Sequence, residues 1–373
     1  MSDFQGPMSL VERDRPELMA MLNLIFRPNG GDMAHDYARH LGPNNLENIR
    51  VIKQNGRIVS HVATSIRPVV LGGIATQVAG IGAVASLPEA RGKGFASLLM
   101  QDAVGRSREQ GADIMLISGD RDLYRRLCAV DCGRFPIVRL TASDMKPVSS
   151  FSLARAGHDD IDDIIALRQT LPTRYLLPRE DLAALLDHKM VMDKPTDWWM
   201  IRRDSETVGW GVLYVQPPDL HLFDWAGNPE ALAGAVPLWL NAYNAETITL
   251  TVTDRYCLPL AWNSFIERER AFDGTVLILD ARRLFERATP YLIERIGEEN
   301  FQRLRIETDQ QRLRVALDSQ KIDLSDGGEI AQFFFGAPQR DFLAECIAPD
   351  SELCFLLSRA FPIPLVWYGI GYV

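Results

Sequence analysis

The sequence lacks the features that would place the chain in a membrane or outside the cell. No run of about 18 apolar residues occurs, so we expect no membrane-spanning helix and no membrane partner. Residues 1–16 include acidic side chains and lack the apolar core of a signal peptide, which predicts a cytoplasmic protein. The five cysteines are odd in number and widely scattered, as in chains whose thiols stay reduced.

Positive charge is also in deficit, with 40 Lys and Arg against 49 Asp and Glu and a net charge of −9. Nucleic-acid binding needs a cationic face, so we expect no nucleic-acid partner. An acidic surface favours a cationic substrate such as an amine, although an ordinary solvated surface gives the same composition. The 47% hydrophobic and 24% charged residues indicate a soluble globular chain. A length of 373 residues predicts two or three domains.

Hydrophobic periodicity and turn signals predict a mixed α/β (α+β) fold in three domains, with boundaries at 1–146, 147–281 and 282–373. In the first domain the expected strands lie at 49–53, 57–70, 74–84, 112–118 and 134–140. Residues 9–28 are expected to form a short strand and then a helix, and further helices are expected at about 33–41, 94–110 and 122–129. A polar segment, 143–150, is the expected linker.

A similar order recurs in the second domain, which indicates a duplicated fold. Helices are expected at 159–170, 179–186 and 229–243, and strands at 198–203, 207–216, 220–227 and 247–252. The third domain begins with a helix at 281–296 and continues with charged alternating strands and further helical segments. It is expected to be an α+β domain.

The segment from Arg91 to Ala96 (Arg91, Gly92, Lys93, Gly94, Phe95, Ala96) joins a strand to an amphipathic helix. The first turn of a helix leaves backbone N–H groups without partners and carries partial positive charge. Glycines let an anion approach that backbone, and Arg91 and Lys93 add charge. This spacing is not a Walker loop, because no Gly-Lys-Ser/Thr ending follows. We interpret the segment as a phosphate-binding site, with a solvated helix start as the alternative.

The stretch "IGAVASLPEARGKGFASLL" resembles the acetyl-CoA signature of the GCN5-related N-acetyltransferases. That family uses Arg or Gln, two variable residues, Gly, one variable residue, and Gly or Ala. Arg91, Gly94 and Ala96 occupy those positions. The resemblance implies that acetyl-CoA is the co-substrate, without a metal, and that its pantetheine arm pairs with the preceding strand at Ala83, Val84 and Ala85.

The layout of the whole chain resembles the enhanced intracellular survival acetyltransferases, which have two tandem acetyltransferase folds and a sterol-carrier-like third domain. "LISGDRDLYRRL" has the form of their catalytic segment and places Tyr124 at the tyrosine, although "CAVDCGRF" departs from the run that often follows. The resemblance also implies a homo-oligomer and a role for the C-terminal carboxylate, here of Val373, as the base. The second domain lacks the Arg-x-x-Gly-x-Ala motif and is expected to be a degenerate, non-binding copy.

The chemistry that follows is direct attack of a primary amine on the thioester. A phenol with a pKa near ~10 stays protonated at neutral pH and can donate to the leaving thiolate. A backbone N–H near Val84 and Ala85 is the expected oxyanion donor. The expected acceptor is a small polycationic amine, aminoglycoside-like or lysine-like. The alternative function is a non-catalytic acyl-CoA- or lipid-binding sensor.

Other side chains admit two interpretations each. Tyr124 could instead pack as a half-buried tyrosine under the sheet. Cys128 and Cys132 have metal-ligand spacing but no nearby histidine, so packed thiols are favoured. His35 and His40 could line a pocket or act as bases, and surface positions are favoured. For Trp198 with Trp199, and for Phe333–Phe335, core packing is favoured over an aromatic platform and a lipid tunnel respectively.

Overall fold

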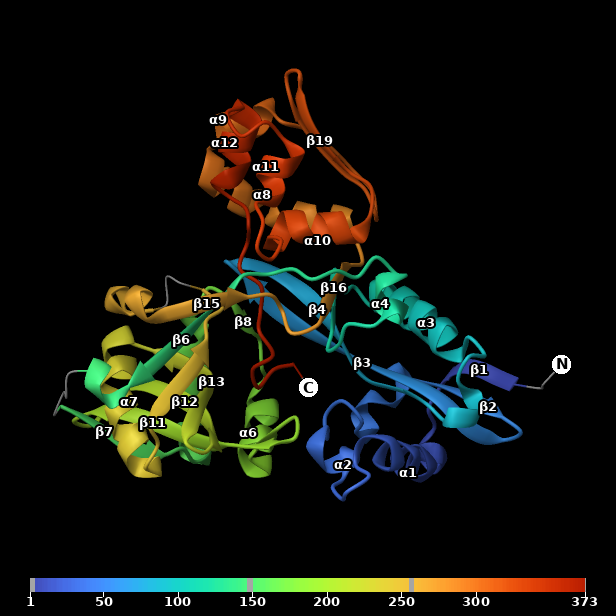
Figure 1. Ribbon diagram of the computed structural model, residues 1–373, viewed down its shortest axis with the longest axis horizontal. Helices are drawn as coiled ribbons and strands as arrows, with labels where there is room; N and C mark the ends of the chain where they lie inside the picture. The colour runs from blue at the N-terminus through green and yellow to red at the C-terminus, as the bar shows by residue number, and fades with distance from the viewer. Residues whose placement is uncertain (1–3, 146–149, 255–257, 373) are drawn as a thin grey trace.

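The computed structural model describes residues 4–145, 150–254 and 258–372, which form three units (Figure 1). Two units lie side by side, and the third stands above the place where they meet. Among the residues described, none of the helices combines the length and apolar character that a membrane crossing requires. The predicted boundary between residues 146 and 147 lies outside the described residues.

The first unit is built on a seven-stranded sheet with the order β1-β2-β3-β4-β5-β16, and β8 pairs with β3. Its strands are β1 (Phe4–Ser9), β2 (Ile49–Gln54), β3 (Arg57–Leu71), β4 (Ile74–Ser86), β5 (Ile114–Ile117), β8 (Arg174–Tyr175) and β16 (Thr275–Ile278). Its helices are α1 (Arg15–Phe26), α2 (Met33–Asp36), α3 (Phe95–Glu109) and α4 (Asp122–Arg125), with 3-10 turns at Glu12–Asp14, Pro43–Asn48 and Pro88–Ala90. β4 and β5 pair in parallel, and the other pairs are antiparallel.

The hairpins of this sheet follow from their turn residues. Asn55 and Gly56, between β2 and β3, have φ of 52° and 79°, the left-handed conformation that a two-residue turn requires. Gly72 and Gly73 give β3 and β4 the same type of connection, with φ of 58° and 96°. The three predicted strands over residues 49–84 are therefore confirmed to within two residues at each end.

The second unit is a seven-stranded sheet with the order β15-β6-β14-β13-β12-β11-β7. Its strands are β6 (Phe135–Thr141), β7 (Phe151–Arg155), β11 (Asp197–Arg203), β12 (Glu206–Gln216), β13 (Asp219–Gly227), β14 (Thr247–Thr251) and β15 (Ile266–Arg270), with a separate hairpin of β9 (Met190–Val191) and β10 (Lys194–Pro195). Its helices are α5 (Ile161–Gln169), α6 (Arg179–His188) and α7 (Pro229–Tyr243), with 3-10 turns at Ala142–Asp144, His158–Asp160 and Leu260–Phe265. β13 and β14 are parallel, as β4 and β5 are in the first unit.

The two sheets exchange strands. β6 was expected in the first domain but pairs with β14 and β15 of the second sheet. In return β16, which precedes the predicted third domain, pairs with β5 of the first sheet. Each exchanged strand continues the sheet next to its parallel pair, so both sheets cover an edge that would otherwise expose unpaired backbone groups. Sheet membership therefore does not follow the predicted boundaries at residues 146 and 281.

The third unit packs helices against a three-stranded antiparallel sheet with the order β17-β18-β19. Its elements are α8 (Ala281–Ile296), α9 (Glu298–Arg303), β17 (Arg305–Thr308), β18 (Leu313–Leu317), β19 (Gln320–Leu324), α10 (Gly327–Phe335), α11 (Phe342–Cys346) and α12 (Glu352–Ser358). One hydrophobic core runs from this unit onto the first sheet and includes Val78, Leu116 and Phe334. The third unit is thus continuous with the first in its packing.

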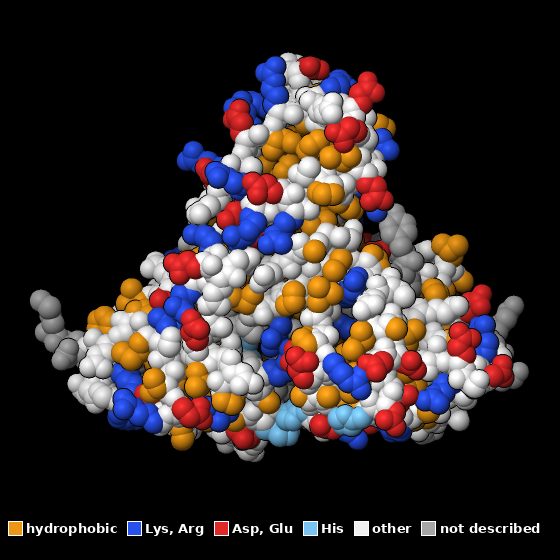
Figure 2. Space-filling view, turned by 180° about the vertical axis from the view of Figure 1, so that it is seen from behind, with side chains coloured by type: hydrophobic (Ala, Val, Ile, Leu, Met, Phe, Trp, Pro, Cys, Tyr) orange, Lys and Arg blue, Asp and Glu red, His pale blue; other side chains and the backbone are white. Residues whose placement is uncertain are grey.

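Residues 359–372, here called the C-terminal tail, run from the third unit down between the first two (Figure 1). Most of the tail is buried, as its apolar sequence predicted. Ile370 joins the core beneath the second sheet, whereas Tyr372 contacts the first sheet. The tail therefore fills part of the space where the units meet. On the rear face, positive and negative side chains are interspersed (Figure 2).

Candidate functional site

The centre of the site is a fork between β4 and β5. The two strands pair from Val78 with Ile114 as far as Ile81 with Ile117, and β4 then continues to Ser86 beside β3 alone. Beyond Ile81 the β5 side of β4 therefore has no neighbouring strand among the described residues. The main chain of Gly82 to Ala85 is left available to pair with an extended ligand.

A β-bulge shapes the same stretch of β4. The register with β3 shifts between His61 and Ala63, and Ala83 has φ of 54°, which is unusual for a residue with a side chain. The ring Nδ1 of His61 lies 2.7 Å from the Ala83 carbonyl oxygen, and because that oxygen only accepts, Nδ1 carries the proton. The His61 imidazole therefore stabilises the bulge by donating a hydrogen bond to the carbonyl of Ala83.

His40 lies next to His61 and is buried, so the prediction of a surface histidine is wrong at this position. A Cβ at Gly82 would lie 2.9 Å from His40 Nε2, which leaves room only for glycine there. Burial, together with the positive charge of Arg67, lowers the pKa of His40 to about 4, and burial lowers the pKa of His61 to about 3. Both rings are therefore neutral at pH 7.

The turn between β4 and α3 presents free backbone donors. Gly92 and Gly94 have φ of 76° and 80°, and a Cβ at either would meet nothing within 4 Å. No side chain caps α3, whose N-cap residue is Gly94. The N–H groups of residues 92–97 have no acceptor among the described residues. They are therefore available to an anion.

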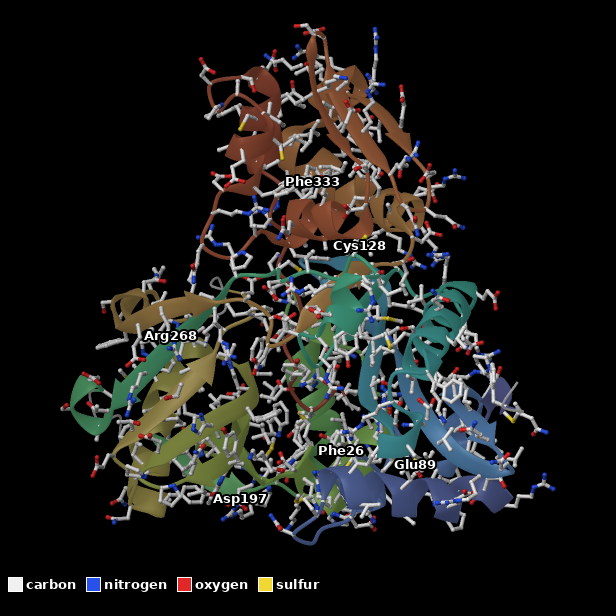
Figure 3. All side chains as sticks on the ribbon, turned by 45° about the vertical axis from the view of Figure 1, so that its right-hand side comes forward. Phe26, Glu89, Cys128, Asp197, Arg268 and Phe333 are labelled. Atoms are coloured by element: carbon white, nitrogen blue, oxygen red, sulfur yellow. The ribbon has the colours of Figure 1, made fainter. Side chains whose placement is uncertain are left out.

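These donors border a cavity of about 630 Å³, here called the α3 cavity. It is lined by Ile25, Phe26, Val84, Ala85, Ser86, Ala90, Arg91, Gly92, Gly94, Phe95, Ala96, Ser97, Arg121, Leu123 and Arg126. Figure 3 shows Phe26 at the end of α1, near the segment that carries Glu89. The cavity thus gathers seven of the nine residues predicted to bind the cofactor.

The other two predicted cofactor residues do not line the α3 cavity. Ala83 lies within the bulge, and its carbonyl is taken by His61. The ammonium of Lys93 instead donates to Gln54 Oε1 at 3.1 Å. Two arginines that sequence reasoning missed, Arg121 and Arg126, line the cavity from the N-cap and the C-cap of α4. The basic run "RDLYRR" was the signal that could have identified them.

Tyr124 projects from the short helix α4, and 4% of its surface is exposed. Burial raises the pKa of Tyr124, and the nearby Arg121 opposes this shift. A Cβ at Gly119 would lie 3.3 Å from the Tyr124 ring. The ring therefore lies against Gly119, and residues beside Tyr124 in the chain, Arg121, Leu123 and Arg126, line the α3 cavity.

On its other side, Gly119 borders a second cavity of about 630 Å³, here called the interunit cavity. It is lined by Ser118, Gly119, Ile137, Met192, Asp193, Lys194, Tyr214, His221, Leu222, Phe223, Thr249, Thr251, Arg268, Arg270, Asp273, Trp367 and Tyr368. These residues come from the end of β5, the second sheet, the β9–β10 hairpin and the C-terminal tail. Tyr124 itself lines neither cavity, but its neighbour Gly119 lines the interunit cavity and its neighbour Leu123 lines the α3 cavity.

The C-terminal tail ends at the fork. The Tyr372 hydroxyl lies 3.0 Å from the Ile81 carbonyl oxygen and 3.3 Å from the Leu116 carbonyl oxygen. Both residues lie where the parallel pairing of β4 and β5 ends. Tyr124 and Tyr37 lie close enough that a phenolate on either would raise the pKa of Tyr372. Val373, the predicted source of the catalytic carboxylate, lies outside the described residues.

Several alternatives left open by the sequence are settled by packing. Cys128 is exposed and Cys132 is buried, both as free thiols, and the described residues contain no cluster of three or more metal-ligating side chains. Trp198 is buried against Trp210, whereas Trp199 donates to the Tyr243 hydroxyl at 2.9 Å. Phe333, Phe334 and Phe335 are core residues of the third unit (Figure 3). His35 is exposed, as predicted.

Comparison with known proteins finds a family match within the first unit. Residues 9–127 match the family of acetyltransferase (GNAT) domains. This segment contains the fork, the glycine turn and Tyr124, so the first unit is an acetyltransferase domain. The enzyme class predicted from the Arg91–Ala96 motif, an acetyltransferase, is confirmed for this domain. Among curated proteins, no significant match to the chain is found.

Solved structures resemble the chain over nearly its whole length. A GCN5-related N-acetyltransferase from Kribbella flavida has a TM-score of 0.67 at 16% identity, covering 98% of this chain and 99% of that one. One from Anabaena variabilis gives a TM-score of 0.66 at 16% identity, covering 98% of both chains. Eis1 from Mycobacterium abscessus gives a TM-score of 0.60 at 11% identity, covering 98% of this chain and 99% of that one. These likenesses confirm the mixed α/β fold class.

Proposed function

We propose that the protein is an acetyl-CoA-dependent N-acetyltransferase that acts on a primary amine. The observation that carries this proposal is the α3 cavity, where the uncapped N–H groups of residues 92–97 meet Arg91, Arg121 and Arg126. Coenzyme A carries a diphosphate, and such an anion suits the positive end of a helix and arginine side chains. No acidic side chain lines this cavity among the described residues.

The pantetheine arm would follow β4 beyond Ile81, where the β5 side of the strand has no partner among the described residues. The thioester would then lie near the bulge at Ala83, with an N–H of Val84 or Ala85 directed at the oxyanion. Fixed backbone donors at such a position stabilise developing negative charge without reorganisation. The His61 contact with Ala83 would hold that geometry.

Tyr124 would act as the general acid. The amine nitrogen forms a bond to the acetyl carbon, and the carbon–sulfur bond breaks as the tetrahedral intermediate collapses. The phenol gives its proton to the departing sulfur and regains one from the nitrogen of the new amide. An ammonium substrate releases one proton to solvent before attack. Burial favours this role, because it keeps the phenol protonated across the neutral range.

Four finer features belong to the same proposal. The third unit is proposed to be sterol-carrier-like, and the second unit to be a degenerate acetyltransferase fold without its own cofactor. A cytoplasmic homo-oligomer is the proposed working form. The carboxylate of Val373 is proposed to assist deprotonation of the amine, which activity after removal of this residue would test.

The direct test is transfer of radiolabelled acetyl groups from acetyl-CoA to a panel of primary amines. Acetylated product that depends on both the enzyme and the amine supports the proposal. Tight binding of acyl-CoA with no transfer to any amine would contradict it and would favour the non-catalytic binding protein.

A further inference from the structure

The charges around the interunit cavity do not suit a polycation. Three cationic side chains, Lys194, Arg268 and Arg270, line it together with two carboxylates, Asp193 and Asp273. Burial lowers the pKa of His221, another lining residue, so its ring adds no charge at pH 7. The cavity therefore carries one net positive charge, although the chain as a whole is acidic.

Both carboxylates of the cavity already face a cation. Arg270 contacts Asp273 at 3.0 Å, and Lys194 lies 3.7 Å from Asp193. Arg270 also lies over the Trp367 ring, 5.0 Å from its centre. A ligand with several ammonium groups would compete with these cations for two acids that are already paired. Like charges brought together in this way are unfavourable.

Arg268 is the third cation of the cavity, and neither Asp193 nor Asp273 forms an ion pair with it. Its backbone belongs to β15, opposite Ile137 of β6, and its exposed guanidinium has no ion pair or hydrogen bond with any described residue (Figure 3). An arginine guanidinium matches a carboxylate with two parallel N–H donors. The unpaired Arg268 thus provides a site for one carboxylate of a ligand.

Most of the remaining wall is apolar or aromatic, with hydroxyl groups from Ser118, Thr249 and Thr251. Tyr214 stacks on His221 with ring centres 4.5 Å apart, and Phe223 packs edge-on against Tyr214. Trp367 and Tyr368 close another part of the cavity from the C-terminal tail. Aromatic faces accept an apolar or aromatic body, and they also attract an ammonium group.

We propose that the acceptor is a primary amine that also carries a carboxylate, an amino-acid-like molecule with an apolar or aromatic body. Its carboxylate pairs with Arg268, and its amine faces Ser118 and Gly119, where the Tyr124 ring lies behind Gly119. This inference rests on the proposed acetyl transfer and replaces the expected polycationic acceptor by a zwitterionic one.

The test compares acetyl transfer to free amino acids and to the same molecules without the carboxylate, such as phenylalanine and phenethylamine, with spermidine as the polycation. We expect kcat/KM to be at least threefold higher for the best amino acid than for its decarboxylated partner. Because Arg268 is exposed, Arg268→Gln should lower that kcat/KM by about three- to fivefold, the range of a solvent-screened ion pair, and change the value for the decarboxylated amine less than about 1.5-fold. Arg305→Gln, on exposed strand β17, is the matched control and should change neither.

The outcomes separate the inference from the proposed function. The inference would be overturned, with acetyl transfer intact, if transfer to spermidine or to decarboxylated amines were faster. An equal loss of kcat/KM for both amines in Arg268→Gln would also overturn it. No transfer to any amine would refute the proposed function, and calorimetric binding would then decide the inference. Phenylalanine binding that is weakened in Arg268→Gln supports the inference. Equal binding of phenylalanine and phenethylamine, or binding of neither, overturns it.

Discussion

Tyr124 is the proposed proton donor. Its ring lies against Gly119, and its pKa is raised by burial, so the phenol holds its proton at neutral pH. A tyrosine in a purely structural role would be buried in the same way. The catalytic proposal therefore depends on its neighbours in the chain, of which Gly119 lines the interunit cavity and Leu123 lines the α3 cavity.

Replacing Tyr124 by Phe tests this role. The ring is kept and the proton is lost, so we expect kcat to fall about 100-fold or more, the usual contribution of a positioned acid. The Kd for CoA should stay within about twofold, because the phosphate donors lie elsewhere. The wild-type rate should rise with pH as the ammonium substrate loses its proton and should decline only above pH 10, since the pKa of Tyr124 is raised. A normal kcat in the variant would exclude Tyr124 as the acid.

Gly94 offers a second test at the level of one residue. A side chain at φ of 80° is strained, and it would also stand where a diphosphate approaches the backbone. We expect Gly94→Ala to weaken CoA binding by tenfold or more in a calorimetric titration and to cost about 1 kcal/mol of stability.

The matched control for Gly94→Ala lies in the same helix. Gly105 of α3 also has nothing within 4 Å of its missing Cβ, but its φ is not positive. Gly105→Ala should leave CoA affinity unchanged and stabilise the helix by about 0.5–1 kcal/mol. Equal losses of affinity in both variants would argue against a phosphate site at Gly94.

The neutral pair of His40 and His61 predicts how stability depends on pH. Their pKa values, about 4 and about 3, lie below the unfolded value of 6.5, so unfolding takes up protons between these limits. Stability is therefore complete above pH 6.5 and is lost as pH falls toward 4. Near pH 5 the slope should approach about 2.7 kcal/mol per pH unit for two protons.

Urea unfolding between pH 7 and pH 5 measures this slope. His40→Gln removes one of the two titrating rings and should roughly halve the slope, whereas His35→Gln, at an exposed position, should leave it unchanged. A slope that is the same in wild type and His40→Gln would show that His40 is not held neutral by the fold.

At the scale of elements, local signals predicted the part of the site that is contiguous in the chain. The turns at Asn55-Gly56 and Gly72-Gly73 set the β2–β4 meander, and the glycines before Phe95 set the start of α3. Helices α7 and α8 have the predicted bounds, because their apolar residues repeat at helical spacing. Periodicity and turn chemistry are both local, so one sequence suffices to locate them.

The rest of the site depends on contacts that local patterns do not encode. β16 is four residues long and apolar throughout, so its sequence does not say which sheet it joins. The partner of β6 is likewise set by tertiary packing. His40 carries no sequence mark of burial, because its environment is made by Gly82, a residue 42 positions away. Arg268 reaches the interunit cavity through the same long-range assembly.

At the scale of the whole molecule, a buried carboxylate joins the third unit to the first. Asp113 has no exposed surface, accepts from Thr76 at 2.6 Å, and pairs with Arg283 and Arg287 of α8. Leu279 N–H also donates to the Asp113 carbonyl at 2.8 Å. These contacts fix the third unit to the end of the first sheet. The C-terminal tail runs from the third unit to the fork between β4 and β5.

Asp113→Ala should therefore destabilise the protein by about 3 kcal/mol, because it removes one member of a largely buried charge network. Glu294→Ala, which removes an exposed carboxylate of helix α8, should stay within about 0.5 kcal/mol of wild type. Both values come from urea unfolding. Equal effects of the two substitutions would show that the Asp113 network does not hold the units together.

The central claim of this account is that the backbone of residues 92–97 holds the diphosphate of coenzyme A. Amide hydrogen exchange over these residues, with CoA and with pantetheine, which lacks the diphosphate, tests it most directly. The account predicts slower exchange at 92–97 with CoA and no change there with pantetheine. Unchanged exchange with saturating CoA, or equal protection by pantetheine, would contradict it.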